Sequence, residues 1–143
     1  FPASRGTGAQ LDGRRIRVSA RRDLTGALIG TGFPYRANAV WMDEYLQMMK
    51  AVTESVAGIR RPGAAALDLA YVAAGRFDGF WELGLAEWDL AAGVLLVREA
   101  GGLVSDLRGG EDYLKTGNIV AGSPKVFAAL VRTLAPHVPA ALR

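Results

Sequence analysis

The fold is most clearly decided by one continuous stretch, Trp88-Asp89-Leu90-Ala91-Ala92-Gly93-Val94-Leu95-Leu96-Val97-Arg98-Glu99-Ala100-Gly101-Gly102. Its apolar and small residues, followed by a glycine pair, predict a helix that starts at Glu87. Asp89 falls in the first turn, where a carboxylate can accept hydrogen bonds from free N–H groups and suits the positive end of the helix dipole. The small residues 91–93 predict close packing of this helix on a neighbouring helix or on a sheet.

Working outward from this helix, strands and helices alternate along the chain. Upstream, the patterns predict strands at residues 14–19, 27–31, 58–61 and 77–85, and helices at residues 39–57 and 62–74. Downstream, they predict strands at residues 103–106 and 118–121 around a Gly-rich loop, then a terminal helix that begins at Ser123-Pro124. Such alternation indicates a layered α/β fold. We expect residues 1–143 to form one domain, or one contiguous half of a larger fold.

The composition is that of a folded domain, because half of the 143 residues are apolar and 22% are charged. No uninterrupted apolar run reaches the roughly 20 residues that a membrane-spanning helix needs. The chain has no cysteine, which excludes disulfides and thiolate metal sites and favours a cytoplasmic location. It begins with Phe1-Pro2-Ala3, neither a methionine nor a signal peptide, so we expect the numbering to start inside a longer chain.

Other function classes find less support in the residues. The formal charge is +3, and arginines cluster early in the chain at Arg14, Arg15, Arg17, Arg21 and Arg22. This cluster would suit an anionic partner, but it lacks the interleaved aromatics of a single-strand nucleic-acid platform, so a solvated strand face explains it better. His137 is the only histidine, which disfavours a Ser-His-Asp arrangement. The Gly-rich phosphate-binding motifs of nucleotide-binding proteins do not occur.

The stretch 88–102 also carries a resemblance to a known family. It fills every fixed position of W-D-x-A-A-G-x-x-L-x-x-E-A-G-G, which resembles the C-terminal signature of the inositol monophosphatase family, and of its bacterial members in particular. The similarity extends to Gly8-Ala9-Gln10-Leu11-Asp12-Gly13, Thr31-Gly32-Phe33-Pro34, residues 60–75 and Gly117-Asn118-Ile119-Val120-Ala121-Gly122. The resemblance implies the C-terminal half of a layered α-β sandwich, with a mixed sheet flanked by helices.

The family's chemistry implies a metal site. These enzymes are Mg²⁺-dependent, lithium-sensitive phosphatases that release inositol and phosphate from inositol monophosphate, and Mg²⁺ binds through oxygen ligands. By resemblance, Asp89 is a catalytic residue, one of the metal carboxylates and a contact to the substrate. Capping of the helix remains compatible with this role, because one oxygen can accept from the backbone while the other binds metal.

The resemblance also implies a substrate site. Glu82, a lone acid in an apolar strand, would accept hydrogen bonds from inositol hydroxyls, although a residue in that position can equally face solvent or pair with an arginine. The turn Gly63, Ala64 and Ala65 would lie against the polyol, where small side chains let the backbone approach the ring. Arg60 would be a further substrate or interface contact. Ser19 is more simply explained as a turn or capping hydroxyl.

The family's remaining metal carboxylates lie in an upstream Glu-Glu segment and in a D-P-x-D-G-T motif, and neither occurs in these residues. Asp89 alone cannot hold two or three divalent ions, so we expect activity to require that other half. Related phosphatases for fructose bisphosphate, a phosphoadenosine nucleotide or histidinol phosphate remain alternatives. A non-catalytic, transcription-associated protein that contacts RNA polymerase is a second class. Family members commonly form homodimers, which we expect here.

Overall fold

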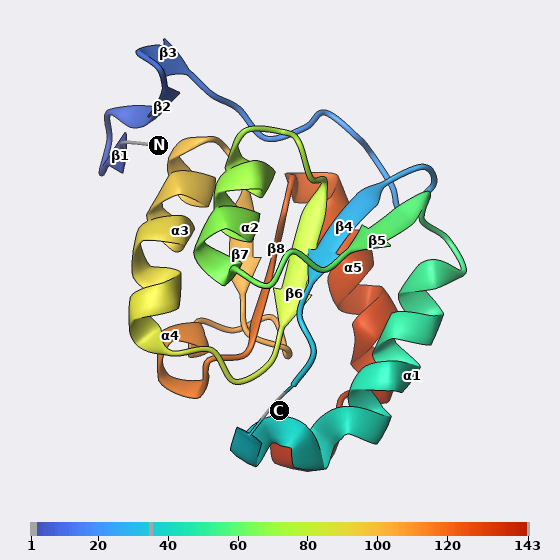
Figure 1. Ribbon diagram of the computed structural model, residues 1–143. Coiled ribbons are helices and arrows are strands. Elements are labelled where there is room, and N and C mark those ends of the chain that lie inside the picture. The colour runs from blue at the N-terminus through green and yellow to red at the C-terminus, as the bar shows by residue number, and fades with distance from the viewer. Residues whose placement is uncertain (1–2, 35, 143) are drawn as a thin grey trace.

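A computed structural model describes residues 3–34 and 36–142 and shows a large sheet between helices, with a small sheet at one end (Figure 1). The small sheet is antiparallel and has the order β1-β2-β3. Its strands are β1 (Ala3–Ser4), β2 (Gly8–Leu11) and β3 (Arg14–Arg15). It lies beside the helix of the signature stretch, and Gly8 N donates to Glu99 Oε1 at 2.8 Å.

The large sheet has five strands in the order β5-β4-β6-β8-β7. They are β4 (Leu28–Thr31), β5 (Gly58–Arg60), β6 (Gly79–Glu82), β7 (Leu103–Ser105) and β8 (Ile119–Gly122). β4 runs parallel to β5 and to β6, whereas β8 runs antiparallel to β6 and β7. The sheet is therefore mixed, and β4 and β6 end at the same edge.

Helices cover both faces of this sheet (Figure 1). α2 (Ala65–Ala73) and α3 (Glu87–Glu99) share one core cluster, and α1 (Met42–Thr53) and α5 (Pro124–Leu134) share the other. Shorter turns complete the chain at η1 (Arg36–Trp41), α4 (Tyr113–Thr116), η2 (Ala135–His137) and η3 (Ala140–Leu142). The layered α/β fold class is confirmed. Within the described residues, no helix combines the length and apolar character needed to cross a membrane.

Strand alternation explains why the sheet carries two cores. In β6, Phe80 packs with α2 and α3, whereas the next residue, Trp81, packs with α1 and α5. Gly93 brings α3 close to α2, because a Cβ at this position would lie 2.6 Å from Leu69 Cδ1. The predicted close packing at residues 91–93 is therefore confirmed at Gly93. Glu82 follows the alternation and lies on the α2–α3 face.

Five predicted elements differ from the structure. The strand expected at residues 77–85 is the shorter β6, and the helix expected at residues 62–74 begins only at Ala65. The expected strand at residues 14–19 stops at Arg15, because Val18 N instead donates to Ala100 O at the end of α3. The expected helix at residues 39–57 opens as the 3₁₀ turn η1 and ends at Thr53, since Ala57 N bonds to Ala27 O and leads the chain into β5. The Gly-rich loop before β8 contains the unpredicted helix α4, which is closed by Gly117.

Candidate active site

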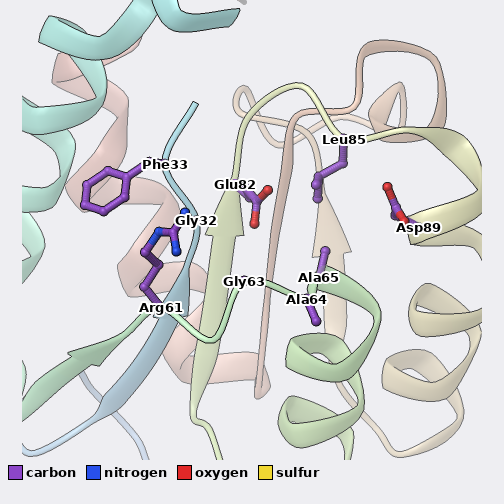
Figure 2. Close-up of a pocket in the computed structure, with 9 residues that line it drawn as sticks. All are labelled: Gly32, Phe33, Arg61, Gly63, Ala64, Ala65, Glu82, Leu85 and Asp89. Carbon is purple, nitrogen blue, oxygen red and sulfur yellow. The ribbon is translucent and has the colours of Figure 1, made fainter. Parts of the chain in front are cut away.

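A cavity of about 490 Å³ opens at the edge of the sheet where β4 and β6 end and where α2 and α3 begin (Figure 2). In sheets with parallel strands, ligand sites form at such carboxyl ends because the loops that follow the strands converge there. The lining residues come from three segments that are far apart in the chain and are Gly32, Phe33, Arg61, Gly63, Ala64, Ala65, Glu82, Leu85 and Asp89. Five residues singled out from the sequence therefore meet in one place, namely Gly63, Ala64, Ala65, Glu82 and Asp89.

Arg60 and Ser19 lie outside this group. Arg60 is the last residue of β5, and its exposed guanidinium donates from Nη1 to Ile59 O at 3.2 Å. Its neighbour Arg61 lines the cavity instead. Ser19 lies beside Gly75, and its buried hydroxyl has no hydrogen-bond partner in the described part of the chain.

Glu82 is the last residue of β6 and is 7% exposed. Its carboxylate lies against the backbone of Gly32, where any Cβ would collide with it. The pKa of Glu82 is raised to about 7, chiefly by burial and also by the neighbouring carboxylates of Asp68 and Asp89, against the opposing effect of the Arg61 guanidinium. At neutral pH this side chain therefore exchanges between its charged and its protonated form.

Asp89 is the third residue of α3 and does not cap that helix. The N-cap is Ala86, which makes no side-chain hydrogen bond, and Asp89 N donates to Ala86 O at 3.0 Å. Within the described residues, no hydrogen bond or ion pair engages the Asp89 carboxylate. The capping interpretation of Asp89 is therefore wrong, and its partly exposed carboxylate remains available to a ligand of the cavity.

A second buried acid, Asp68, lies behind the site and was not predicted as part of it. It is fully buried in α2, and neither carboxylate oxygen has a hydrogen-bond partner among the described residues. Burial raises its pKa to about 6. The sequence did carry a signal, because Asp68 is the only acid in the apolar run of residues 64–74. Its charge acts on the site through Glu82, whose pKa it raises.

Replacing Asp68 with Asn should stabilise the complete protein above pH 6. Burial raises the pKa of Asp68 from its ordinary value of 3.8 to about 6 in the native state. The native state therefore binds this proton more tightly than the unfolded state, and the wild-type protein loses stability as the pH rises from about 4 to above 6. Asn does not titrate and so avoids this loss. We expect the variant's free energy of unfolding, relative to that of the wild type, to be about 1–3 kcal/mol higher at pH 8 than at pH 4. Urea unfolding at both pH values measures it, with exposed Asp43→Asn as control. An equal difference at the two pH values would contradict the assignment.

The chemistry of Asp89 fits a divalent metal ion in part. A carboxylate that lines a cavity and has no protein partner is a suitable oxygen ligand for Mg²⁺. However, no group of three or more His, Cys, Asp or Glu residues that could hold a metal occurs within residues 3–34 and 36–142. The described residues thus supply one ligand rather than a complete set.

The sequence profile of the inositol monophosphatase family matches residues 1–139. The chain belongs to the inositol monophosphatase family. Over its full length it is 60% identical to a protein named Nus factor SuhB from Pseudomonas aeruginosa and 52% identical to the Nus factor SuhB of Escherichia coli. It covers 53% of each of these relatives, so the chain spans about half the length of the curated relatives it matches.

Solved structures of inositol monophosphatase family proteins agree with this membership. The extragenic suppressor protein suhB of Bartonella henselae superposes with a TM-score of 0.88 at 52% identity, over 92% of this chain and 50% of that one. An inositol monophosphatase from Anabaena superposes with a TM-score of 0.83 at 36% identity, over 97% and 55% of the two chains. The fold expected from the resemblance is therefore that of solved family members, and the chain belongs to a phosphatase family.

Proposed function

We propose that the complete protein hydrolyses inositol monophosphate to inositol and phosphate with Mg²⁺ as cofactor. The observation that carries the proposal is the cavity itself, where the unpartnered carboxylate of Asp89, the buried Glu82 and the small turn of residues 63–65 meet. This combination offers an oxygen ligand for a metal, an acceptor for hydroxyls and a surface that a sugar ring can approach closely. A second half of the protein would complete the metal site.

Each residue then has a distinct task. Mg²⁺ bound at such a site would polarise the phosphate and activate a water molecule. Asp89 would hold the metal from the start of α3. Glu82, in its charged form, would accept hydrogen bonds from inositol hydroxyls and so orient the ring. The exposed turn Gly63-Ala64 would let backbone groups reach the polyol, because no long side chain stands between them.

Substitution of Glu82 by Gln tests the substrate. In the complete protein we expect kcat/KM for inositol 1-phosphate to fall about 10- to 150-fold, the equivalent of about 1.5–3 kcal/mol for a charge-assisted hydrogen bond. Phenyl phosphate offers no hydroxyl to Glu82, so its hydrolysis should change much less. The exposed Glu54→Gln, at the end of α1, is the matched control. Equal losses on the two substrates would mean that Glu82 only supports the fold.

The same assay separates the related substrates. Fructose bisphosphate, a phosphoadenosine nucleotide and histidinol phosphate are turned over by phosphatases of the same architecture. If the complete protein clearly preferred one of them over inositol 1-phosphate, the proposed substrate would change, but the proposed reaction, hydrolysis of a phosphate monoester, would remain.

A transcription-associated role is the second candidate function. Relatives of this chain bear the name Nus factor SuhB, and the early arginines are exposed along residues 14–22. Arg21 is engaged with Asp78, with 3.3 Å between Nε and Oδ2. The remaining guanidinium groups would suit a salt-sensitive contact to nucleic acid or RNA polymerase. If the Asp89→Asn variant of the complete protein still bound nucleic acid or RNA polymerase, this binding would establish a role independent of catalysis.

Three further properties belong to the same proposal. Turnover would be inhibited by lithium, as in the family. The location would be cytoplasmic, in keeping with a chain that has no cysteine. The complete protein would be a homodimer, and its sedimentation as a monomer at micromolar concentration would remove this last claim.

A further inference from the structure

A short connection, residues 83–86, joins the two acidic residues of the candidate active site. Glu82 ends β6, and α3 begins at Glu87 and carries Asp89 in its first turn. Leu85, inside the connection, lines the cavity, and Figure 2 shows it between Glu82 and Asp89. The shape of this connection therefore sets where Asp89 lies relative to Glu82.

The connection is bound by Gly117 and Asn118, the two residues that precede β8. Gly84 N donates to Asn118 Oδ1 at 2.9 Å, and Leu85 N donates to Gly117 O at 2.9 Å. The Asn118 side chain is buried, with 7% of the residue exposed. Neither Gly117 nor Asn118 lines the cavity, so any effect that they have on the site passes through the connection.

The fit between the two segments is close and depends on glycine. Gly117 has a φ of +76° and closes α4, and a Cβ at this position would lie 2.6 Å from Leu85 N. Gly84 also has a positive φ, +70°, and a Cβ on it would collide with the side chain of Asn38. Gly84 is thus packed against Asn38 and bound to Asn118, in a backbone conformation that favours glycine.

The first turn of α3 lacks a support of its own. Its N-cap, Ala86, makes no side-chain hydrogen bond, whereas a polar side chain in this position would accept from the free amides. The body of the helix is held further along, where Gly93 packs closely on α2 and Glu99 Oε1 accepts from Gly8 N. The position of Asp89 thus depends on the connection that precedes it.

Glu82, by contrast, is fixed by the sheet. It pairs with Ile119 in the ladder between β6 and β8, and it is buried against the backbone of Gly32. The bonds of such a ladder join main-chain groups and do not depend on the Asn118 side chain. Loss of the Asn118 bond should consequently displace Asp89 and leave Glu82 in place.

We propose that Asn118 is a positioning residue for the metal ligand Asp89, which it holds in place through the connection 83–86. The inference rests on the proposed function and adds to it a residue that lies outside the cavity. It predicts a selective effect, because Mg²⁺ binding should weaken when the Asn118 bond is lost, whereas recognition of the inositol ring should not.

Variants of the complete protein isolate this bond. Asn118→Leu keeps the size of the side chain but offers no acceptor to Gly84 N. Asn118→Asp keeps an acceptor oxygen and should restore the wild-type behaviour. Asn118→Ser is too short to reach Gly84 and takes the place of Asn118→Leu if that variant fails to fold. Tyr113→Phe in α4 is the matched control, because it removes only the hydrogen bond that Tyr113 OH accepts from Arg98 Nη2 at 2.6 Å.

The first measurement is hydrogen–deuterium exchange of the metal-free complete protein, which does not depend on activity. In Asn118→Leu we expect the amides of residues 83–90 to exchange about 3- to 10-fold faster than in the wild type, because Gly84 N loses its acceptor. Exchange within β6 and β8 should be unchanged. Tyr113→Phe should leave the exchange of residues 83–90 at its wild-type rate.

The second measurement is the Mg²⁺ dissociation constant from calorimetric titration, together with turnover. Asn118→Leu should weaken Mg²⁺ binding about 10- to 100-fold, the usual range for residues that orient a metal ligand. The Mg²⁺ concentration for half-maximal turnover should rise to the same degree. The ratio of kcat/KM for inositol 1-phosphate to that for phenyl phosphate, which Glu82→Gln should lower, should keep its wild-type value.

Each failure points to a different error. If Asn118→Leu speeds exchange in residues 83–90 but keeps the wild-type Mg²⁺ affinity, or if Tyr113→Phe weakens Mg²⁺ binding equally, the positioning role is overturned while the proposed function stands. The same holds if Asn118→Asp does not recover Mg²⁺ binding, or if the ratio of the two substrates also falls in Asn118→Leu. A wild-type protein that neither binds Mg²⁺ nor hydrolyses inositol 1-phosphate would overturn the proposed function, and the role of Asn118 with it.

Discussion

Asp89→Asn in the complete protein is expected to lower Mg²⁺-dependent turnover of inositol 1-phosphate by more than about 100-fold. Mutation of residues that only hydrogen-bond to a metal ligand typically lowers metal affinity or activity about 10- to 100-fold, and loss of a ligand itself should cost more. Asn keeps the size of the side chain but removes the charge that would hold the metal. The fold should remain, since the Asp89 carboxylate makes no hydrogen bond or ion pair among the described residues and does not cap α3. Catalysis and folding are therefore separable at this residue.

The measurement is phosphate release over a range of Mg²⁺ concentrations, together with thermal unfolding. Asp43→Asn is the matched control, because Asp43 is an exposed acid in the first turn of α1 that does not line the cavity. It should keep full turnover while losing a similar favourable interaction with a helix dipole. A variant Asp89→Asn that retained most of the wild-type rate would remove Asp89 from the metal site.

The regular elements of the fold could be predicted because their signals are local. α3 begins at Glu87, as the pattern of the signature stretch predicts, and β4, β5, β7 and β8 lie within one residue of their expected positions. The strand expected at residues 14–19 failed because its alternation of apolar residues has another cause. Ile16 and Val18 are partly buried against the α2–α3 core, but the strand ends at Arg15. Ile16 N still donates to Ala9 O of β2, whereas Val18 N donates to Ala100 O at the end of α3. Alternation reports burial on one side, not strand pairing.

The residues of the site could be named from the sequence only through the family resemblance. Local physics assigned Asp89 to capping, and the structure gives that task to the backbone at Ala86. The same approach could not tell which of Arg60 and Arg61 lines the cavity. That depends on the residue at which β5 ends and on the packing of Phe33. The burial of Asp68 depends on long-range packing between α2 and its neighbours. These are tertiary facts that spacing along the chain does not contain.

The isolated chain 1–143 is expected to release no appreciable phosphate from inositol 1-phosphate, even with abundant Mg²⁺. Two or three divalent ions need several carboxylates, and the cavity offers Asp89 together with a Glu82 that is partly protonated near pH 7. No group of three potential metal-binding side chains occurs in the described part of the chain. The shortage of ligands, rather than a failure to fold, is the expected cause.

Circular dichroism of the isolated chain distinguishes these two causes, since a folded but inactive chain is the predicted result. The complete protein supplies the reference rate, and its Asp89→Asn variant supplies the background rate of a folded protein with a disabled metal site. The isolated chain should match that background. If instead the chain, purified free of host phosphatases, hydrolysed inositol 1-phosphate at a rate comparable with the complete protein, the metal site would lie wholly within these residues. The proposed division of the active site between two halves would then be wrong.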